Sequence, residues 1–243
     1  MREYSIRGLR IIHEYLPGKN KLFITGFKGY GLVGYLTTLY LAQELGCKRS
    51  GVILTRYMPE AITVDEQGLV PPFELYSCSI GDLGIIIQVN HDLPHPVDRT
   101  RFADALTLWL IKEGFMEAVY IGGFDSRYRS GEEKYKWLST SSWTRRLGAP
   151  RMDKGLYVVG PLALLTLFSE LRGIPALVLL PYAEASRPDP RAAAIAIEVL
   201  NEIYNLRVDV GKLLEEASKI EAMVQAMEAA QREQPSGAER AYM

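Results

Sequence analysis

A run of glycines near the start of the chain is the first pattern that could do chemistry. Gly29, Gly31 and Gly34 have the spacing of the dinucleotide-binding motif, in the stretch GYGLVG. An apolar run at 21–26 predicts a buried strand before the motif, and apolar residues at helical spacing over 32–45 predict a helix after it. Backbone N–H groups at such a turn can cradle a pyrophosphate. The motif therefore raises the hypothesis of a nucleotide- or nucleoside-binding enzyme that uses the Gly29–Gly34 loop.

The residue that should support this motif is missing. An acidic side chain that holds a ribose hydroxyl is expected after the second strand, but the strand at 51–57 offers Arg56, and Glu60 follows only after Pro59. Arg56 would suit a 2′-phosphate instead. Glycines also allow a tight strand-to-helix turn to pack closely against a sheet. We favour this packing interpretation, and we expect no bound cofactor.

Two histidines and an aspartate lie in the loop after a later strand. His91, Asp92 and His95 could begin a metal site, but Pro94 and Pro96 interrupt the loop and His13 is the one other histidine. We therefore expect no metal site. The sequence has no Gly-x-Ser-x-Gly elbow and no Walker A lysine, so we assign no catalytic residue.

The segment 124–154 mixes basic and aromatic residues without an apolar period, and we interpret it as a long surface excursion. Arginines and lysines alternate there with Tyr128, Tyr135, Trp137 and Trp143. Such a pattern can stack on single-stranded nucleic acid. Tyr, Trp and Arg are also enriched in oligomer and partner contacts, which is the interpretation we favour.

The last three residues have a chemistry of their own. Ala241, Tyr242 and Met243 form a hydrophobic residue, a tyrosine, any residue and then a free carboxylate. The carboxylate can pair with a lysine, and the tyrosine supplies rigid amphipathic area with a hydroxyl group. The stretch QPSG at 234–237 cannot continue a helix, so we expect 233–243 to be a flexible tail.

The rest of the chain alternates between predicted strands and helices. We expect further strands at 51–56, 73–79, 84–89, 118–122, 156–159 and 176–180, with helices at 98–112, 161–172 and from 190 onwards. Alternation of this kind predicts a three-layer α/β/α domain over 1–208, with a mostly parallel sheet covered on both faces.

A final helix over 209–232 has an apolar seam with a seven-residue repeat. The seam consists of Val210, Leu213, Ala217, Ile220, Val224 and Met227. A narrow seam over three heptads is typical of helix-to-helix packing between chains, so we expect a homo-oligomer. The alternative is that the seam packs on its own domain.

Composition excludes several classes of protein. The formal net charge of the 243 residues is −1, which gives no reason to expect nucleic acid or an anionic membrane as partner. The most apolar stretch is too short to span a bilayer. Two cysteines without metal-ligand spacing, and a start without a signal-peptide pattern, favour a cytoplasmic protein in a reducing compartment.

Several stretches together resemble the proteasome-assembly-chaperone family in its archaeal form. They are the strand and glycine turn at 23–34, the middle helix with its flanks at 160–173, and the helical end at 188–193, 206–209 and 213–221. The order and spacing of these stretches carry the resemblance. It implies a fold like that of nucleoside phosphorylases, without their catalytic residues, together with self-association and binding to proteasome α subunits.

The resemblance also gives the tail a role. Residues 241–243 are similar to the hydrophobic-tyrosine-any motif that proteasome ATPases and chaperones insert between adjacent α subunits. In this comparison Tyr242 lies against the wall of the pocket, the Met243 carboxylate meets a lysine and Ala241 fills the hydrophobic slot. Ala241 is smaller than the residue usually found there. An oligomer that carries several tails compensates, because each bound tail raises the effective concentration of the next.

The sequence therefore predicts a non-enzymatic proteasome assembly chaperone, or a proteasome-binding scaffold, that docks on the core particle. A proteasome activator that opens the gate is an alternative that uses the same tail. The nucleotide-binding enzyme is the alternative from a different class. A second homologous chaperone stays open as a further partner.

Overall fold

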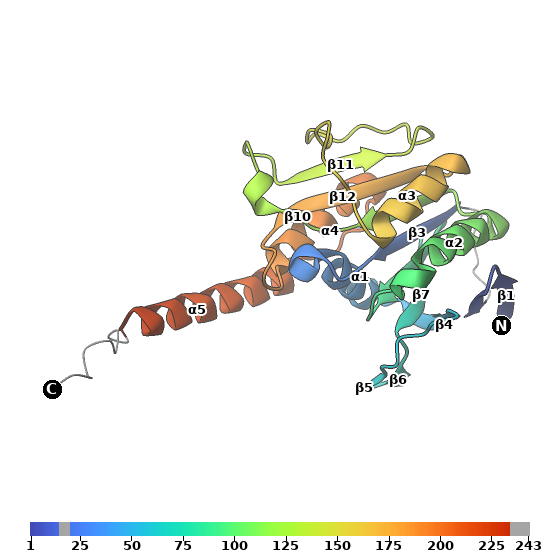
Figure 1. Ribbon diagram of the computed structural model, residues 1–243, viewed down its shortest axis with the longest axis horizontal. Helices are drawn as coiled ribbons and strands as arrows, with labels where there is room; N and C mark the ends of the chain where they lie inside the picture. Colours follow the sequence, from blue (N-terminus) through green and yellow to red (C-terminus); the bar gives the residue numbers. More distant parts are fainter. Residues whose placement is uncertain (15–19, 234–243) are drawn as a thin grey trace.

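The computed structural model describes residues 1–14 and 20–233, with side chains to Met223. Most of the described strands belong to one twisted sheet, and helices cover both of its faces (Figure 1). The strands of this sheet are β1 (Arg2–Ile6), β2 (Leu9–His13), β3 (Asn20–Gly26), β4 (Lys48–Leu54), β7 (Phe73–Ile80), β8 (Leu83–Asn90), β9 (Glu117–Ile121), β10 (Phe124–Asp125), β11 (Tyr135–Ser139) and β12 (Ala176–Ala183). The helices are α1 (Val33–Glu44), α2 (Arg99–Glu113), α3 (Pro161–Leu171), α4 (Pro190–Tyr204) and α5 (Gly211–Glu233). None of the described helices combines the length and the apolar character that a bilayer crossing requires.

The sheet is mixed, so the prediction of a mostly parallel sheet was wrong in its detail. Its order is β1-β2-β4-β7-β8-β3-β9-β12-β10, with β11 paired to β12. Among the described strands of this sheet, four neighbouring pairs are parallel and five are antiparallel. The parallel pairs lie together, from β8 through β3, β9 and β12 to β10.

Short turns explain the antiparallel half. Arg7 and Gly8, both with positive φ, connect β1 to β2, and Gly81 with φ of 56° lies in the turn between β7 and β8. Two-residue turns of this kind can join only antiparallel strands. The alternation of strands and helices in the sequence comes from the longer crossovers. Two of them, β8 to β9 through α2 and β9 to β12 through α3, connect strands of the parallel half.

Two apolar cores lie on opposite faces of the sheet. On one face α2 and α3 cover β3 and its neighbours, with Phe23, Trp109 and Leu165 fully buried. On the other face α1 and α4 cover the same strands, with Ile24, Leu41 and Ile197 fully buried. Every residue of β12 is buried, as expected of a strand covered on both faces.

Segment 124–160 differs from its prediction. Within the segment expected to be a surface excursion, β11 pairs with β12, and both Trp137 and Trp143 are buried. The strand expected at 156–159 is not formed, because this stretch has no strand partner among the described residues. Its apolar residues alternate between core and solvent: Leu156 and Val158 pack on the core, and Tyr157 is 84% exposed.

A small hairpin of β5 (Thr63–Asp65) and β6 (Gly68–Val70) extends from the body beside β4 (Figure 1). Cys47, directly before β4, and Cys78, near the end of β7, form a disulfide. Two cysteines in a chain of this length favour a reducing compartment, in which a disulfide is not expected. The antiparallel register, which pairs Lys48 with Ser77, brings the two cysteines together.

Reduction of this disulfide should destabilise the protein. The bond closes a loop between residues 31 positions apart, and cross-links of this kind contribute about 2–4 kcal/mol, mainly by restricting the unfolded chain. We expect the urea midpoint of the oxidised protein to fall when dithiothreitol is added. A Cys47→Ser/Cys78→Ser variant serves as the control, and its midpoint should not respond to the reductant. An equal midpoint for the wild type with and without dithiothreitol would contradict the cross-link.

Candidate functional site

The glycine turn packs closely against the backbone at the carboxyl ends of the parallel strands. After β3 the chain forms a short 3-10 helix, Tyr30–Leu32, and then α1. A Cβ on Gly34 would lie 2.3 Å from the Ile121 carbonyl oxygen and 2.7 Å from the Phe27 nitrogen. A Cβ on Gly26 would lie 2.5 Å from the Gly34 Cα. The first turn of α1 therefore rests directly on the backbone of β3 and β9.

Gly31 ties the same turn to another element. Its φ is 60°, and its carbonyl accepts a hydrogen bond from the Asp189 backbone N–H at 2.8 Å. A Cβ on Gly31 would meet the Cβ atoms of Ala183 and Asp189 within 3 Å. Asp189 in turn caps α4, because its carboxylate accepts from the Ala192 N–H at 3.0 Å. The packing of the turn accounts for Gly31 and Gly34 without a nucleotide, as the packing interpretation expects.

We predict that Gly34→Ala lowers the free energy of unfolding by about 1–3 kcal/mol or more, since the methyl group overlaps rigid backbone. Gly29→Ala is the matched control in the same motif, because no atom lies within 4 Å of a Cβ added there. Its effect should stay within about 0.5 kcal/mol. Denaturant unfolding of both variants measures the difference. Similar stability of the two variants would show that close packing is not the reason for Gly34.

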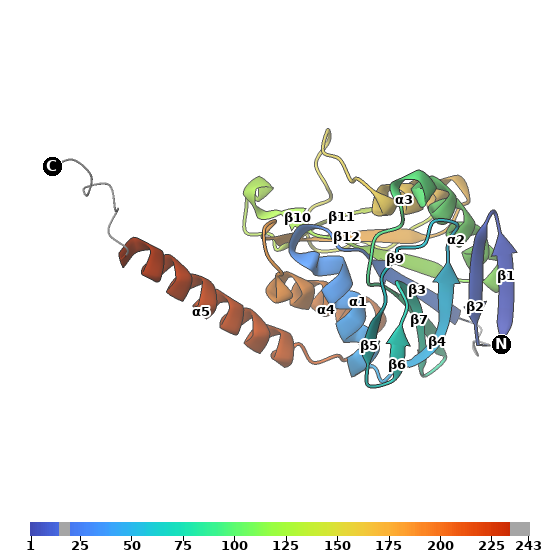
Figure 2. The same cartoon turned by 60° about the horizontal axis from the view of Figure 1, so that its bottom comes forward.

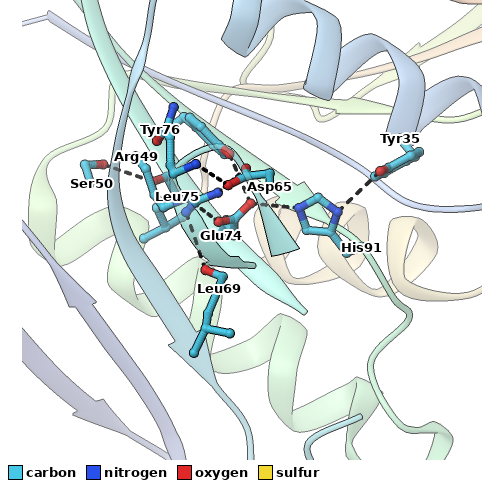
Figure 3. A network of polar contacts seen from close by, with 10 residues as sticks. Tyr35, Arg49, Ser50, Asp65, Leu69, Glu74, Leu75, Tyr76 and His91 are labelled. Carbon is cyan, nitrogen blue, oxygen red and sulfur yellow. Dashed lines mark hydrogen bonds and ion pairs between the residues drawn. The ribbon is translucent and has the colours of Figure 1, made fainter. Parts of the chain in front are cut away.

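His91 belongs to a buried polar network rather than to a metal site (Figure 3). Its Nε2 lies 2.7 Å from the Glu74 Oε2 atom, and its Nδ1 lies 3.3 Å from the Tyr35 hydroxyl. A carboxylate can only accept, so the Nε2–H of His91 donates to Glu74. Burial and the neighbouring Glu74 raise the pKa of Tyr35, which keeps its hydroxyl protonated. The described residues contain no cluster of three potential metal ligands.

Arg49 extends the network to the exposed hairpin. Its Nε lies 2.6 Å from the Glu74 Oε1 atom, and its NH2 donates to the Asp65 carboxylate at 2.6 Å (Figure 3). Tyr76 adds a hydroxyl donor to Glu74 at 3.1 Å. Glu74 is fully buried, so these partners replace the water that its charge would otherwise need. The network fixes β4, β7 and the loop after β8 in one arrangement, and its residues are engaged with one another.

The basic and aromatic segment uses many of its groups internally. The Trp137 indole N–H donates to the Ala149 carbonyl at 2.8 Å. The Arg145 guanidinium lies over the rings of Trp143 and Tyr204, at 5.2 and 5.1 Å from their centroids, and pairs with Glu117 at 2.7 Å. These ring faces are therefore occupied within the chain, which disfavours the use of this segment as a stacking platform for nucleic acid.

A cavity of about 570 Å³ lies at the carboxyl ends of the parallel strands. Residues that follow four neighbouring strands line it: Phe27 to Tyr30 after β3, Leu93 and Arg99 after β8, Gly122 to Asp125 after β9 and Ala185 after β12. Tyr128 and the stretch 156–162 complete the lining. The strand-end rule pointed to His91 and the glycine motif in the sequence. It did not point to Lys28, Arg99 and Tyr128, because no local motif marks them.

The seam of the last helix is divided between two environments. Leu213 and Ala217 are almost fully buried against the α1/α4 core, with Val210 packed beside them, and Ile220 is half-buried. Arg191 of α4 holds Glu221 at 3.1 Å. The helix then continues away from the body to Glu233 (Figures 1 and 2). The side chains of Val224 and Met227, and the whole tail with Ala241, Tyr242 and Met243, lie outside the described residues.

Comparison with known proteins places this fold in a family. Two solved structures from Pyrococcus furiosus are similar over most of their length. The first is PbaA, described as an archaeal homolog of proteasome-assembly chaperone, with 24% identity, a TM-score of 0.76 and coverage of 93% of this chain and 94% of that one. The second is PbaB, described as an archaeal proteasome activator, with 21% identity, a TM-score of 0.78 and coverage of 92% and 100%.

A curated protein and a family model also match this chain. An uncharacterized protein of Methanocaldococcus jannaschii is 24% identical over 223 residues, which cover 89% of this chain and 86% of the relative. The model of the PAC2 family matches residues 23–228, which include the glycine turn, helices α1 to α4 and most of α5. The chain therefore belongs to the PAC2 family.

Proposed function

We propose that this protein is a non-enzymatic proteasome assembly chaperone or proteasome-binding scaffold. It docks its C-terminal tails between α subunits of the core particle. Membership of the PAC2 family carries the proposal. The fold shared with PbaA, described as an archaeal homolog of proteasome-assembly chaperone, supports it.

The placement of α5 supports the use of the tail. The base of the helix is fixed to the body, because Lys212 pairs with Glu44 of α1 at 2.7 Å and the Tyr40 hydroxyl donates to the Asp209 carbonyl at 2.8 Å. From this base the helix runs for 23 residues, or roughly 34 Å at 1.5 Å per residue, away from the sheet (Figure 2). An arm of this kind would carry residues 241–243 to a surface that the body itself does not touch.

The proposal includes self-association through the outer half of the seam. Leu213 and Ala217 are used for packing within the chain, as the alternative interpretation of the seam expects for this half. Val224 and Met227 continue the same seven-residue repeat beyond the point where α4 supports the helix. Apolar residues on an arm without support from the body are suited to the same residues of another copy. Several tails in one assembly would then bind more tightly than one.

The non-enzymatic part of the proposal rests on the site geometry. The glycine turn is filled by its own packing, and His91 and Glu74 are engaged with each other. A kinship with the fold of nucleoside phosphorylases, without their catalytic residues, is part of the same proposal.

We predict that Tyr242→Ala abolishes most of the binding of proteasome α subunits in a pull-down or by biolayer interferometry, because the tyrosine ring supplies most of the rigid area of the tail. Tyr157→Ala is the matched control, since it removes a tyrosine that is 84% exposed on the folded body. Equal binding by wild type and the Tyr242 variant would move the contact onto the body and contradict the tail mechanism.

A proteasome activator that opens the gate is the alternative function, and it would use the same tail. The structural similarity to PbaB, described as an archaeal proteasome activator, supports this alternative. Hydrolysis of short peptides by the finished core particle separates the two roles. An assembly chaperone or scaffold leaves the rate unchanged, whereas an activator that opens the gate raises it.

A Val224→Glu/Met227→Glu variant should reduce the oligomer to single chains in light scattering, since like charges would face each other across the seam. Met223→Glu places a charge on the same helix at a position that is 69% exposed, and it should leave the mass unchanged. A wild-type protein that already scatters as a single chain would overturn self-association through this seam.

A further inference from the structure

The cavity lies where the connections of two neighbouring parallel strands diverge. The chain leaves β3 into α1, which covers one face of the sheet, and after β9 it reaches α3, which covers the other face. In open α/β sheets this divergence leaves a crevice outside the carboxyl ends of the strands, and ligands bind there. The cavity is lined by the residues that follow β3 and β9, Phe27 to Tyr30 and Gly122 to Asp125.

The size and the walls of the cavity suit a small organic molecule. Its volume of about 570 Å³ falls within the range of ligand pockets, roughly 300–1,000 Å³. The floor is apolar, with Phe27, Phe124 and Leu180 buried or nearly so. Gly160 leaves part of the wall as bare backbone, since no atom lies within 4 Å of a Cβ added there, and a ligand can approach it closely.

Two cations in the lining have no counter-ion among the residues that the structure describes. Among the described residues, the Arg99 guanidinium donates from Nε to the Pro94 carbonyl at 3.0 Å and meets no carboxylate. The Lys28 ammonium lies 5.1 Å from the centroid of the Tyr35 ring and is likewise without a carboxylate among these residues.

The one acid in the lining is already neutralised. The Asp125 carboxylate accepts from Arg127 Nε at 3.0 Å and from Arg127 NH2 at 2.6 Å. These hydrogen bonds hold the pKa of Asp125 below its usual value. The lining as a whole is therefore complementary to an anion.

Three tyrosines complete the lining with exposed rings. Tyr30 is 46% exposed, Tyr128 is 59% exposed and Tyr157 is 84% exposed. Burial of an aromatic ring stabilises a protein, so three exposed tyrosines beside one cavity are notable. Tyrosine rings that remain accessible beside a cavity offer flat faces for stacking. A ligand with a planar ring would cover part of this area, and its acidic group would meet Lys28 and Arg99.

We propose that this cavity binds a small organic anion in which a carboxylate or phosphate is joined to a planar ring. The acidic group lies between Lys28 and Arg99, and the ring lies on the apolar floor among the tyrosines. The site binds and does not catalyse, because no general base faces the cavity without a partner among the described residues. This proposal is independent of the tail and of proteasome binding.

Isothermal titration calorimetry of the full chain with five probes tests the proposal. AMP supplies a phosphate on a ring and indole-3-acetate supplies a carboxylate; adenosine and indole are their neutral counterparts, and inorganic phosphate is the anion without a ring. We expect at least one of the two ring-bearing anions to bind at least tenfold more tightly than its neutral counterpart and than phosphate. AMP binding alone identifies a phosphate ligand, and indole-3-acetate binding alone identifies a carboxylate.

Two arginines near the start of α2 provide the matched variants. Arg99→Met removes a cation of the cavity and should weaken binding of the anion about tenfold, whereas Arg101→Met removes a cation that lines a different cleft and should leave binding unchanged. Lys28→Met is the second cavity variant, and its side chain is exposed, so its fold should be intact. Thermal unfolding of each variant verifies this. Absence of binding by both anions at millimolar concentration, equal binding of a neutral counterpart, or equal loss in Arg99→Met and Arg101→Met would overturn the proposal.

Discussion

The contact between the first turn of α1 and the backbone of β3 and β9 is the constraint on which the carboxyl end of the sheet depends. Gly34 meets the Ile121 carbonyl and Gly26 without any side chain between them. Because protein interiors are close-packed, a larger residue at either glycine would push α1 away from the sheet. The position of α1 then determines where the loop at 27–31 lies, and that loop forms one wall of the cavity.

The parallel half of the sheet could be predicted from the sequence, and the antiparallel half could not. Long crossovers such as β8 to β9 through α2 leave a clear pattern of apolar strand, turn residues and helical spacing. The hairpins β1-β2 and β7-β8 depend on turns of two residues, Arg7-Gly8 and Gly81-Asp82, whose signals are local and weak. The disulfide follows from the same pairing, because only the register of β4 on β7 shows that Cys47 and Cys78 meet.

The candidate sites also differ in how far the sequence predicts them, because some depend on local patterns and others on contacts between distant segments. The packing role of Gly31 and Gly34 could be inferred because a strand-to-helix turn constrains its glycines within a few residues. The cavity depends on Lys28, Arg99 and Tyr128, which follow three different strands in the sequence, and only the strand order shows that these residues approach one another. The heptad pattern of α5 indicated an apolar seam, but a repeat does not distinguish packing on α4 from packing on another copy. Burial of Leu213 and Ala217 assigns the inner half to α4.

The cavity wall and the arm are joined by one continuous set of contacts. Gly31 accepts a hydrogen bond from the backbone of Asp189, the carboxylate of Asp189 caps α4, and Arg191 in the first turn of α4 holds Glu221 of α5. These contacts connect the turn that forms the cavity wall to α4 and α5, and the burial of Leu213 and Ala217 holds the inner half of α5 on the body. A ligand can shift such an arrangement only if it binds two forms of it with different affinity. With the turn held by Gly34 against rigid backbone, the described contacts favour a single arrangement, in which the body serves as a fixed base for the arm.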